Sequence, residues 1–250
     1  MRALITGASS GIGRDIAREL ASRGCDLILA ARRTDRLEAL AEEFSVETEV
    51  ISSDLSVPGE ARRLYEATRD RGVDILVNCA GFGLMGSFTE TDLQRELDMI
   101  EVNVTALHVL TKLYLGEFAP RGEGYVLNVA SSAAFLPGPL LSAYYATKAY
   151  VLRLCQSVNG ELKHSGSPVR ITCLCPGPVR TEFDRVAGVK KSLQGMESAD
   201  VARIAVRAMF RRKGVVTPGL ATTLGRVAAH LLPDGVLTEF GYRTQNKKIR

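Results

Sequence analysis

The stretch Ala3-Leu-Ile-Thr-Gly-Ala-Ser-Ser-Gly-Ile-Gly13 joins a short apolar run to a turn that holds three glycines. The run predicts a buried strand, and a pattern of helical period begins after the turn at Asp15. Glycines let the backbone approach a phosphate closely, and the free N–H groups at a helix start favour its negative charge. The stretch therefore predicts a strand, a phosphate-binding turn and a helix. The glycine spacing is not the common Gly-x-Gly-x-x-Gly, and a glycine-rich turn alone is a weak signal.

Apolar runs alternate with longer segments of helical period along most of the chain. The predicted strands are Ala3 to Ile5, Leu27 to Ala31, Val50 to Ser52, Ile75 to Val77, Tyr125 to Val129, Val169 to Leu174 and Val215 to Val216. The predicted helices are Asp15 to Arg23, Asp35 to Glu43, Glu60 to Arg71, Leu93 to Phe118, Ala143 to His164 and Ala199 to Arg212. Thr91 followed by Gln94 resembles a capping box at the start of one helix. This rhythm, with strands that are apolar throughout, predicts one α/β domain whose parallel sheet is covered on both faces.

Composition and charge favour a protein that acts on a small molecule. With 250 residues, of which 46% are hydrophobic and 24% charged, the chain can bury one sizeable core. The net charge of +4 is spread along a chain without Trp, so nucleic-acid binding has little support. The five Cys lack zinc-like pairs, which predicts reduced thiols in a cytosolic protein and no metal site. We expect no export signal, because the apolar run Ala3 to Thr6 leaves no room for a charged region and a long apolar region before it. We expect no transmembrane segment, because Pro137 and Pro139 interrupt the uncharged stretch Gly124 to Thr147.

A phenol, an ammonium and a hydroxyl occur at spacings that suit chemistry on a carbonyl group. Tyr144 and Lys148 are four residues apart in a helical pattern, so their side chains would share one face. A nearby positive charge lowers the pKa of a phenol toward the range of a general acid or base. Ser131 follows the predicted strand Tyr125 to Val129 and could polarise the carbonyl from beside the helix. Tyr145 lies three residues before Lys148, so spacing alone leaves open which phenol acts.

Taken together, six motifs resemble the short-chain dehydrogenase/reductase family over roughly residues 3 to 217. They are Thr6-Gly-x-x-x-Gly-x-Gly13, Asn78-Cys-Ala-Gly81, Asn103, Ser131, Tyr144-x-x-x-Lys148 and Pro176-Gly177, in the family's order and at its usual separations. The family's Ser precedes its Tyr by thirteen positions, which selects Ser131 over Ser132 and Tyr144 over Tyr145. Cys79 stands where the family often has a second Asn, a change that concerns packing near the cofactor more than chemistry.

This resemblance implies a Rossmann-type, doubly wound sheet of seven parallel strands in the order 3-2-1-4-5-6-7, with a dinucleotide across their carboxyl ends. The dehydrogenase/reductase core would span residues 1–217, and residues 218–250 would form a C-terminal extension. The implied catalytic residues are Tyr144 as general acid or base, Lys148 beside it, Ser131 on the substrate oxygen, and Asn103, which would bend its helix and hold a water against Lys148. The expected cofactor-binding residues are Gly7, Ser9, Ser10, Gly11, Ile12, Gly13, Arg32, Arg33, Asp54, Leu55, Asn78, Ala80, Gly81, Tyr144, Lys148, Pro176, Gly177, Val179 and Thr181.

The end of the second strand predicts the choice of cofactor. An NAD-selective protein would place an acidic residue there to accept from the ribose 2′-OH, but this chain has Ala31 followed by Arg32 and Arg33. A guanidinium fits a phosphate bidentately, and no carboxylate repels a 2′-phosphate at this point. NADP(H) is therefore the expected cofactor.

Apolar residues around the predicted site favour a hydrophobic ketone or secondary alcohol as substrate. They are Leu84, Met85, Phe135, Leu136, Leu140, Leu141, Phe183, Val186, Val189, Leu193 and Met196. An acyl ketone, a steroid-like alcohol, an aromatic ketone and a sugar all remain open as substrates. The alternative function is a dinucleotide sensor without turnover, but relatives of that kind lose the Tyr or the Lys, and both are present here. The family's habit of pairing its long helices predicts a homodimer or homotetramer through Leu93 to Phe118 and Ala143 to His164.

Beyond Thr217 the resemblance fades, and apolar residues recur at helical spacing from Leu220 to Leu231. This helix could cover the substrate cleft, pack in a subunit interface, or lie on a membrane surface with the basic tail Arg243 to Arg250. Packing on its own subunit or on a partner is the expectation.

Overall fold

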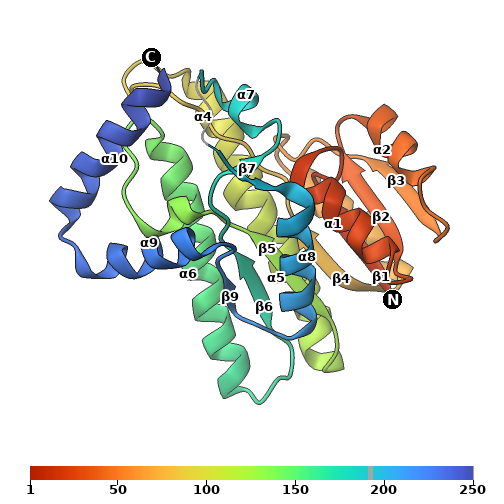
Figure 1. The fold of residues 1–250 in the computed structure, drawn as a ribbon. Helices are drawn as coiled ribbons and strands as arrows, with labels where there is room; N and C mark the ends of the chain where they lie inside the picture. The colour runs from red at the N-terminus through yellow and green to blue at the C-terminus, as the bar shows by residue number, and fades with distance from the viewer. Residues whose placement is uncertain (191–193, 250) are drawn as a thin grey trace.

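Seven parallel strands form one sheet in this computed structural model, which describes residues 1–190 and 194–249 (Figure 1). Their order is β3-β2-β1-β4-β5-β6-β9, which confirms the predicted doubly wound, Rossmann-type topology. The strands of the sheet are β1 (Arg2–Thr6), β2 (Asp26–Ala31), β3 (Thr48–Ser52), β4 (Val73–Asn78), β5 (Tyr125–Val129), β6 (Ile171–Leu174) and β9 (Val215–Val216). Two further short strands, β7 (Val179–Arg180) and β8 (Met196–Glu197), pair with each other.

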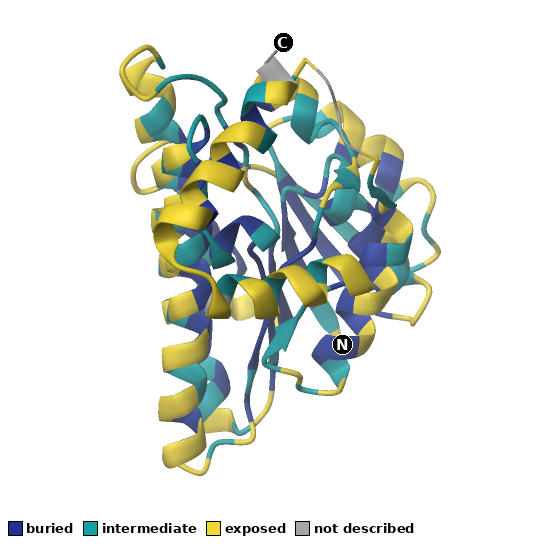
Figure 2. Ribbon diagram, turned by 60° about the vertical axis from the view of Figure 1, so that its left-hand side comes forward, coloured by how far each residue is buried: buried dark blue, intermediate teal, exposed yellow. Residues whose placement is uncertain are grey.

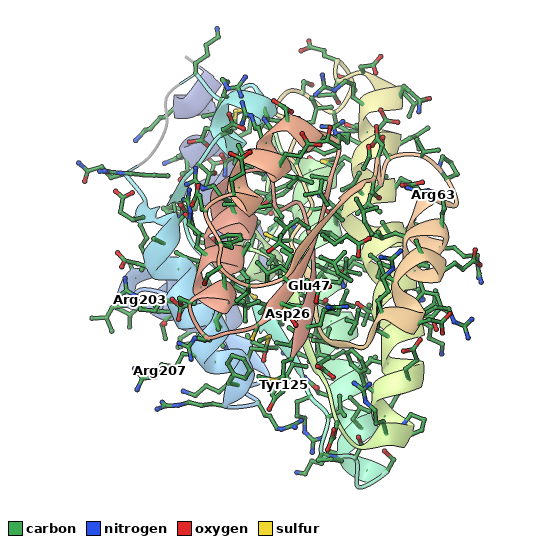
Figure 3. All side chains as sticks on the ribbon, turned by 90° about the vertical axis from the view of Figure 1, so that its right-hand side faces the viewer. Asp26, Glu47, Arg63, Tyr125, Arg203 and Arg207 are labelled. Carbon is green, nitrogen blue, oxygen red and sulfur yellow. The ribbon has the colours of Figure 1, made fainter. Side chains whose placement is uncertain are left out.

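Helices cover both faces of the sheet. α1 (Gly11–Ala21), α2 (Thr34–Ala41) and α8 (Ser198–Phe210) pack on one face, and α3 (Glu60–Thr68), α5 (Leu107–Arg121) and α6 (Ser142–His164) pack on the other. Successive residues of a strand point to opposite faces, so Ile5 joins the first core and Leu4 the second. Figure 2 shows the buried strands between the two helical layers. Charged side chains lie outside, as Figure 3 shows for Arg203 and Arg207 of α8.

The helix predicted from Leu93 to Phe118 is divided in the structure. It consists of α4 (Leu93–Ile100), the π-helical segment η2 (Glu101–Ala106) and α5. Such wider turns often occur at functional sites, and this one carries Asn103. The predicted capping box is wrong: Asp92 caps α4 by accepting a hydrogen bond from the Arg95 N–H at 2.9 Å, whereas Thr91 donates to Glu96.

The C-terminal extension forms two helices, α9 (Leu220–Leu231) and α10 (Asp234–Ile249). α9 was predicted, but the residues from Arg243 onward were expected only as a basic tail. α9 lies against the short 3-10 helix η3 (Ser132–Phe135), and α10 folds back so that Leu237 and Gln245 are buried. The outer sides of both helices are largely exposed (Figure 2). Of the three positions expected for the helix from Leu220 to Leu231, α9 therefore packs on its own chain, and the unpredicted α10 brings Gln245 to the cavity.

Within the described residues, no helix combines the length and the apolar composition needed to cross a membrane. All five cysteines are free. The Sγ atoms of Cys173 and Cys175 lie 3.8 Å apart in the core on the α6 side of the sheet. Residues 1–190 and 194–249 contain no group of three or more His, Cys, Asp or Glu side chains that could hold a metal ion.

Candidate active site

A cavity of about 350 Å³ opens at the carboxyl ends of the central strands. In open α/β sheets this is where ligands bind, beside the point at which the strand order reverses. The predicted site residues that line the cavity are Gly7, Ser9, Ser10, Gly11, Ile12, Gly13, Arg32, Arg33, Asp54, Leu55, Ala80, Gly81, Ser131, Tyr144, Lys148, Pro176, Gly177, Val179 and Thr181. Two predicted residues, Asn78 and Asn103, are not among the lining residues.

The glycine-rich turn is folded tightly between β1 and α1. Gly7 has a φ of +70°, a conformation that favours glycine, and its N–H donates to the Ala30 carbonyl at 2.9 Å. A side chain at Gly13 would overlap the carbonyl oxygen of Gly7. Because the turn is this compact, the first residues of α1 border the cavity and direct the positive end of the helix toward it.

The end of β4 forms the floor of the cavity beside this turn. Thr6 Oγ1 accepts hydrogen bonds from the N–H groups of Cys79 and Ala80 at 3.1 and 3.3 Å. A Cβ atom at Gly81 would lie 2.9 Å from Asn103 Oδ1 and 3.3 Å from Lys148 Nζ. Glycine at this position therefore lets the floor approach the lysine closely.

The phenol, the ammonium and the hydroxyl predicted from the sequence come together on one wall of the cavity. Lys148 Nζ donates to the Val129 carbonyl at 2.9 Å and lies 5.8 Å from the centre of the Tyr144 ring. Ser131 lines the same wall as Tyr144, and its Oγ accepts from the Ala133 N–H at 3.1 Å. The strand end after β5 and the start of α6 thus present the three groups to the same space.

Burial has the largest effect on the pKa values of Tyr144 and Lys148, and the expected lowering of the Tyr144 pKa was wrong. Burial raises the pKa of Tyr144 well above its usual value, while the hydrogen bond to Ser131 opposes the shift only in part. The sequence had suggested that Lys148 lowers this pKa. Instead, desolvation lowers the pKa of Lys148 itself to about 8, because the ammonium is buried. At neutral pH the phenol is therefore protonated and the lysine is largely charged.

The two asparagines lie behind the cavity wall. The Asn103 amide donates to the Phe82 carbonyl at 2.9 Å and to Thr147 Oγ1 at 3.1 Å, and its oxygen accepts from the Phe82 N–H. Asn78 donates to Thr111 and Asn128 and joins β4 to its neighbours. Asn103 thus connects the π-helical segment to α6 one residue before Lys148. The water-holding role of Asn103 and the cofactor contact of Asn78 stay predictions.

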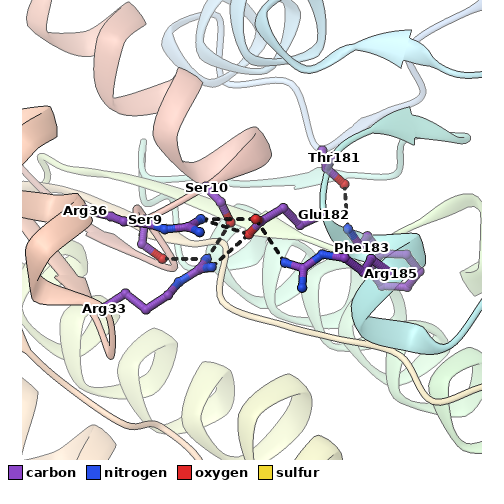
Figure 4. Close-up of polar contacts among 8 residues, drawn as sticks. All are labelled: Ser9, Ser10, Arg33, Arg36, Thr181, Glu182, Phe183 and Arg185. Atoms are coloured by element: carbon purple, nitrogen blue, oxygen red, sulfur yellow. Dashed lines mark hydrogen bonds and ion pairs between the residues drawn. The ribbon is translucent and has the colours of Figure 1, made fainter.

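Arg33, Arg36 and Arg185 gather around the Glu182 carboxylate beside Ser9 and Ser10 of the glycine-rich turn (Figure 4). Arg33 donates to the hydroxyls of Ser9 and Ser10 at 3.1 and 3.0 Å and to the Glu182 carboxylate at 2.9 Å. Glu182 also accepts from Arg36 and Arg185, and its pKa is lowered to about 2, above all by the hydrogen bond from Arg33. Arg32 is exposed and lines the same cavity. A guanidinium is therefore already held where the turn and the end of β2 meet.

The substrate side is apolar, but fewer of the predicted residues take part than expected. The Phe183 ring, at the start of α7 (Phe183–Ala187), lies 5.2 Å from the Tyr144 ring. Of the predicted apolar set, Leu141, Phe183 and Val186 line the cavity, and Leu84 and Met85 pack close to them. Phe135 and Met196 instead pack against the main cores. Leu136, Leu140 and Val189 do not line the cavity, and Leu193 lies outside the described residues.

Sequence reasoning missed several lining residues. Phe82 follows the Asn78-Cys-Ala-Gly81 motif directly, so its position next to the site could have been anticipated. Glu182 follows Thr181, but nothing in the sequence signals that its carboxylate meets arginines from residues 33 and 36. Gln245 reaches the cavity from α10, one hundred residues beyond Tyr145. No local pattern indicates such a contact.

Comparisons with known proteins agree with this geometry. A family model described as short chain dehydrogenase matches residues 1–191. A protein of Staphylococcus epidermidis, called an uncharacterized oxidoreductase, is 34% identical over 79% of this chain and 87% of its own. A short-chain dehydrogenase from Sphingobium yanoikuyae, solved in complex with NADPH, is 34% identical with a TM-score of 0.83, over 92% of this chain and 93% of its own. A bulky-bulky ketone specific alcohol dehydrogenase from Comamonas testosteroni is 30% identical with a TM-score of 0.79, over 92% of each chain.

Proposed function

The chain belongs to the short-chain dehydrogenase family, and from this premise we propose that it is an NADP(H)-dependent oxidoreductase that interconverts a hydrophobic ketone and a secondary alcohol. The observation that carries the proposal is the convergence of Ser131, Tyr144 and Lys148 on one wall of a cavity whose opposite end holds the glycine-rich turn and Arg33. We further propose that it acts in the cytosol, as its reduced thiols suggest.

The residues around the cavity fit a dinucleotide. The turn from Ser9 to Gly13 would hold the pyrophosphate, and Arg33 with Arg32 would hold the 2′-phosphate. Asp54 and Leu55 would contact the adenine, and the segment from Pro176 to Thr181 would contact the nicotinamide side. When bound, NADPH supplies the hydride.

The wall residues then complete the reduction by handling the proton and the oxygen. Because the pKa of Tyr144 is raised, its phenol is protonated at neutral pH and can donate to the developing alkoxide. Ser131 can donate a hydrogen bond to the same oxygen, which favours charge there in the transition state. Lys148 keeps a positive charge next to the phenol and so stabilises the tyrosinate that remains after proton transfer.

Two relatives support the finer parts of this proposal. The Sphingobium structure contains NADPH, which agrees with Arg33 and with the missing acidic residue after β2. The Comamonas enzyme is named for bulky ketones, which agrees with the apolar residues Leu141, Phe183 and Val186 on the substrate side.

The experiment that tests this function is a screen of NADPH oxidation over ketones graded in size and polarity. We expect kcat/KM to rise with apolar area, by about fourfold per buried methylene where the full ~0.8 kcal/mol is used in the transition state. Phe183→Ser should lower kcat/KM for the bulkiest ketones by roughly tenfold, because the lost ring buries apolar area against Tyr144.

Phe88→Ser is the matched control, since Phe88 is 66% exposed and lies outside the cavity wall. A preference for small sugars that Phe183→Ser leaves unchanged would contradict the hydrophobic substrate. If NADPH binds but no ketone in the screen is reduced, the result would favour the alternative function, a dinucleotide sensor without turnover.

We also propose that the chain forms a homodimer or homotetramer through its long helices. Leu93, Leu97 and Ile100 of α4 and Tyr150 of α6 are large apolar residues that stay at least 39% exposed in the single chain. Leu93, Leu97 and Ile100 share one face of α4 by their spacing, and exposed apolar residues on one helix face favour a partner. Most soluble oligomers are symmetric assemblies of one chain. Light scattering at micromolar concentration should therefore give the mass of two or four chains; a monomer mass would contradict the proposal.

A further inference from the structure

A buried amide from the C-terminal helix meets the tyrosine next to the predicted acid. Gln245 of α10 is only 3% exposed and lines the cavity. Its Nε2 donates to the hydroxyl of Tyr145 at 2.6 Å. The Tyr145 ring in turn lies 6.2 Å from the Tyr144 ring, in an edge-to-face arrangement. Tyr145 and Gln245 therefore bring polar groups to the cavity wall beside Tyr144, the proposed acid.

Close packing fixes both members of this pair. The Tyr145 ring lies over Gly138, where any side chain would overlap it. α10 approaches the same loop through Gly241, where a Cβ atom would lie 3.1 Å from the Pro137 carbonyl oxygen and 3.3 Å from a Pro139 side-chain carbon. The loop around Gly138 thus sets the distance between Tyr145 and α10, and the amide cannot move away from the phenol without moving the helix.

The hydrogen bond leaves the Tyr145 proton available. The hydroxyl oxygen accepts from Gln245 Nε2, so its own O–H remains a donor, and it donates to no acceptor among the described side chains. Burial raises the pKa of Tyr145, so this proton is present at neutral pH. Gln245 Oε1 is also buried without a hydrogen-bond partner in the described part of the chain. Buried polar groups are normally satisfied, so an incomplete network at a cavity wall indicates a ligand that completes it.

We infer that Tyr145, oriented by Gln245, recognises a second oxygen atom on the ketone substrate. The recognition site takes a hydroxyl or carbonyl oxygen carried by an otherwise apolar ketone, which accepts a hydrogen bond from the Tyr145 hydroxyl. Tyr145 is then a specificity residue and Gln245 is a positioning residue. This inference rests on the proposed ketone reduction, and it narrows the substrate class from hydrophobic ketones to hydrophobic ketones with one further oxygen.

The test compares 4-phenylcyclohexanone with its ortho, meta and para hydroxyphenyl analogues, using NADPH and the full chain. In the wild type we expect at least one hydroxylated ketone to have a kcat/KM about tenfold above the parent, as a made hydrogen bond allows. Tyr145→Phe should bring that ratio close to one. Gln245→Glu should do the same by a different route, because a carboxylate accepts the Tyr145 proton and withdraws it from the substrate.

Tyr150→Phe is the matched control: it removes a tyrosine hydroxyl from the same helix, bonded to His108 and away from the cavity. It should keep the tenfold ratio. The inference is overturned if every hydroxylated analogue has a kcat/KM close to that of the parent in the wild type, or if Tyr145→Phe leaves a tenfold ratio intact. In either case, reduction of the parent ketone would still uphold the proposed function. If no ketone, the parent included, is reduced, the proposed function fails and the inference fails with it.

Discussion

Replacing Tyr144 by Phe is expected to lower kcat for ketone reduction by about 10²–10⁴-fold, the usual contribution of a positioned general acid. The substitution keeps the ring that packs against Phe183 and removes only the hydroxyl on the cavity wall. Folding and cofactor binding should therefore be retained. The measurement is the steady-state rate of NADPH oxidation at saturating ketone, combined with NADPH titration calorimetry on the same variant.

Tyr145→Phe is the natural comparison, because spacing from Lys148 left both phenols open. In the structure the Tyr145 hydroxyl accepts a hydrogen bond from Gln245, whereas Tyr144 shares the cavity wall with Ser131 and Lys148 and lies with its ring 5.8 Å from Lys148 Nζ. We expect the loss of kcat to be far larger in Tyr144→Phe. If Tyr144→Phe turns over as fast as the wild type, or if the two variants exchange behaviour, the assigned acid is wrong.

Replacing Arg33 by Ala is expected to weaken NADPH binding roughly tenfold or more and to leave NADH binding nearly unchanged. A charge-assisted hydrogen bond contributes about 1.5–3 kcal/mol, and about 1.4 kcal/mol corresponds to a factor of ten in Kd. Arg33 is the better choice than Arg32, since its guanidinium is already held against Ser9 and Ser10 of the glycine-rich turn. Calorimetric titration with each dinucleotide measures both affinities.

Arg36→Ala is the matched control for this experiment. Arg36 shares the Glu182 carboxylate with Arg33 but does not line the cavity. Its loss should therefore not weaken the binding of NADPH.

Because the Glu182 carboxylate accepts a hydrogen bond from Arg33 in the structure, Glu182→Gln should tighten the binding of NADPH by freeing the guanidinium. Equal affinities of the wild type for NADPH and NADH would contradict the cofactor assignment.

The strands of the sheet could be predicted because the signal for each one lies within a short stretch of sequence. In a sheet that helices cover on both faces, each strand is an apolar run. The strands of the main sheet, β1 to β6 and β9, all match predicted runs to within a few residues. The site residues that follow strand ends could also be predicted, since the carboxyl ends of parallel strands meet at one edge. Ser131 and Gly81 reach the cavity in this way.

What could not be predicted depends on contacts between distant parts of the chain. The family resemblance implied a bend at Asn103, but helical periodicity does not record the contacts that its amide makes with Phe82 and Thr147 at the π-helical turn. The polar residues at the chain's C-terminal end gave no sign that Gln245 would be buried on Tyr145. The pKa of Tyr144 was expected to fall, but burial, which depends on the whole fold, raises it.

The most direct test of the proposed reaction follows the hydride itself. NADPH with both hydrogens on the reactive carbon of the nicotinamide replaced by deuterium is incubated with the protein and a bulky hydrophobic ketone, and the product is examined by mass spectrometry. The proposal predicts a secondary alcohol that carries deuterium on its carbinol carbon in the wild type, with formation of this product strongly reduced in Tyr144→Phe. If NADPH binds tightly but no deuterated alcohol forms from any ketone of the series, the protein is not the reductase proposed here.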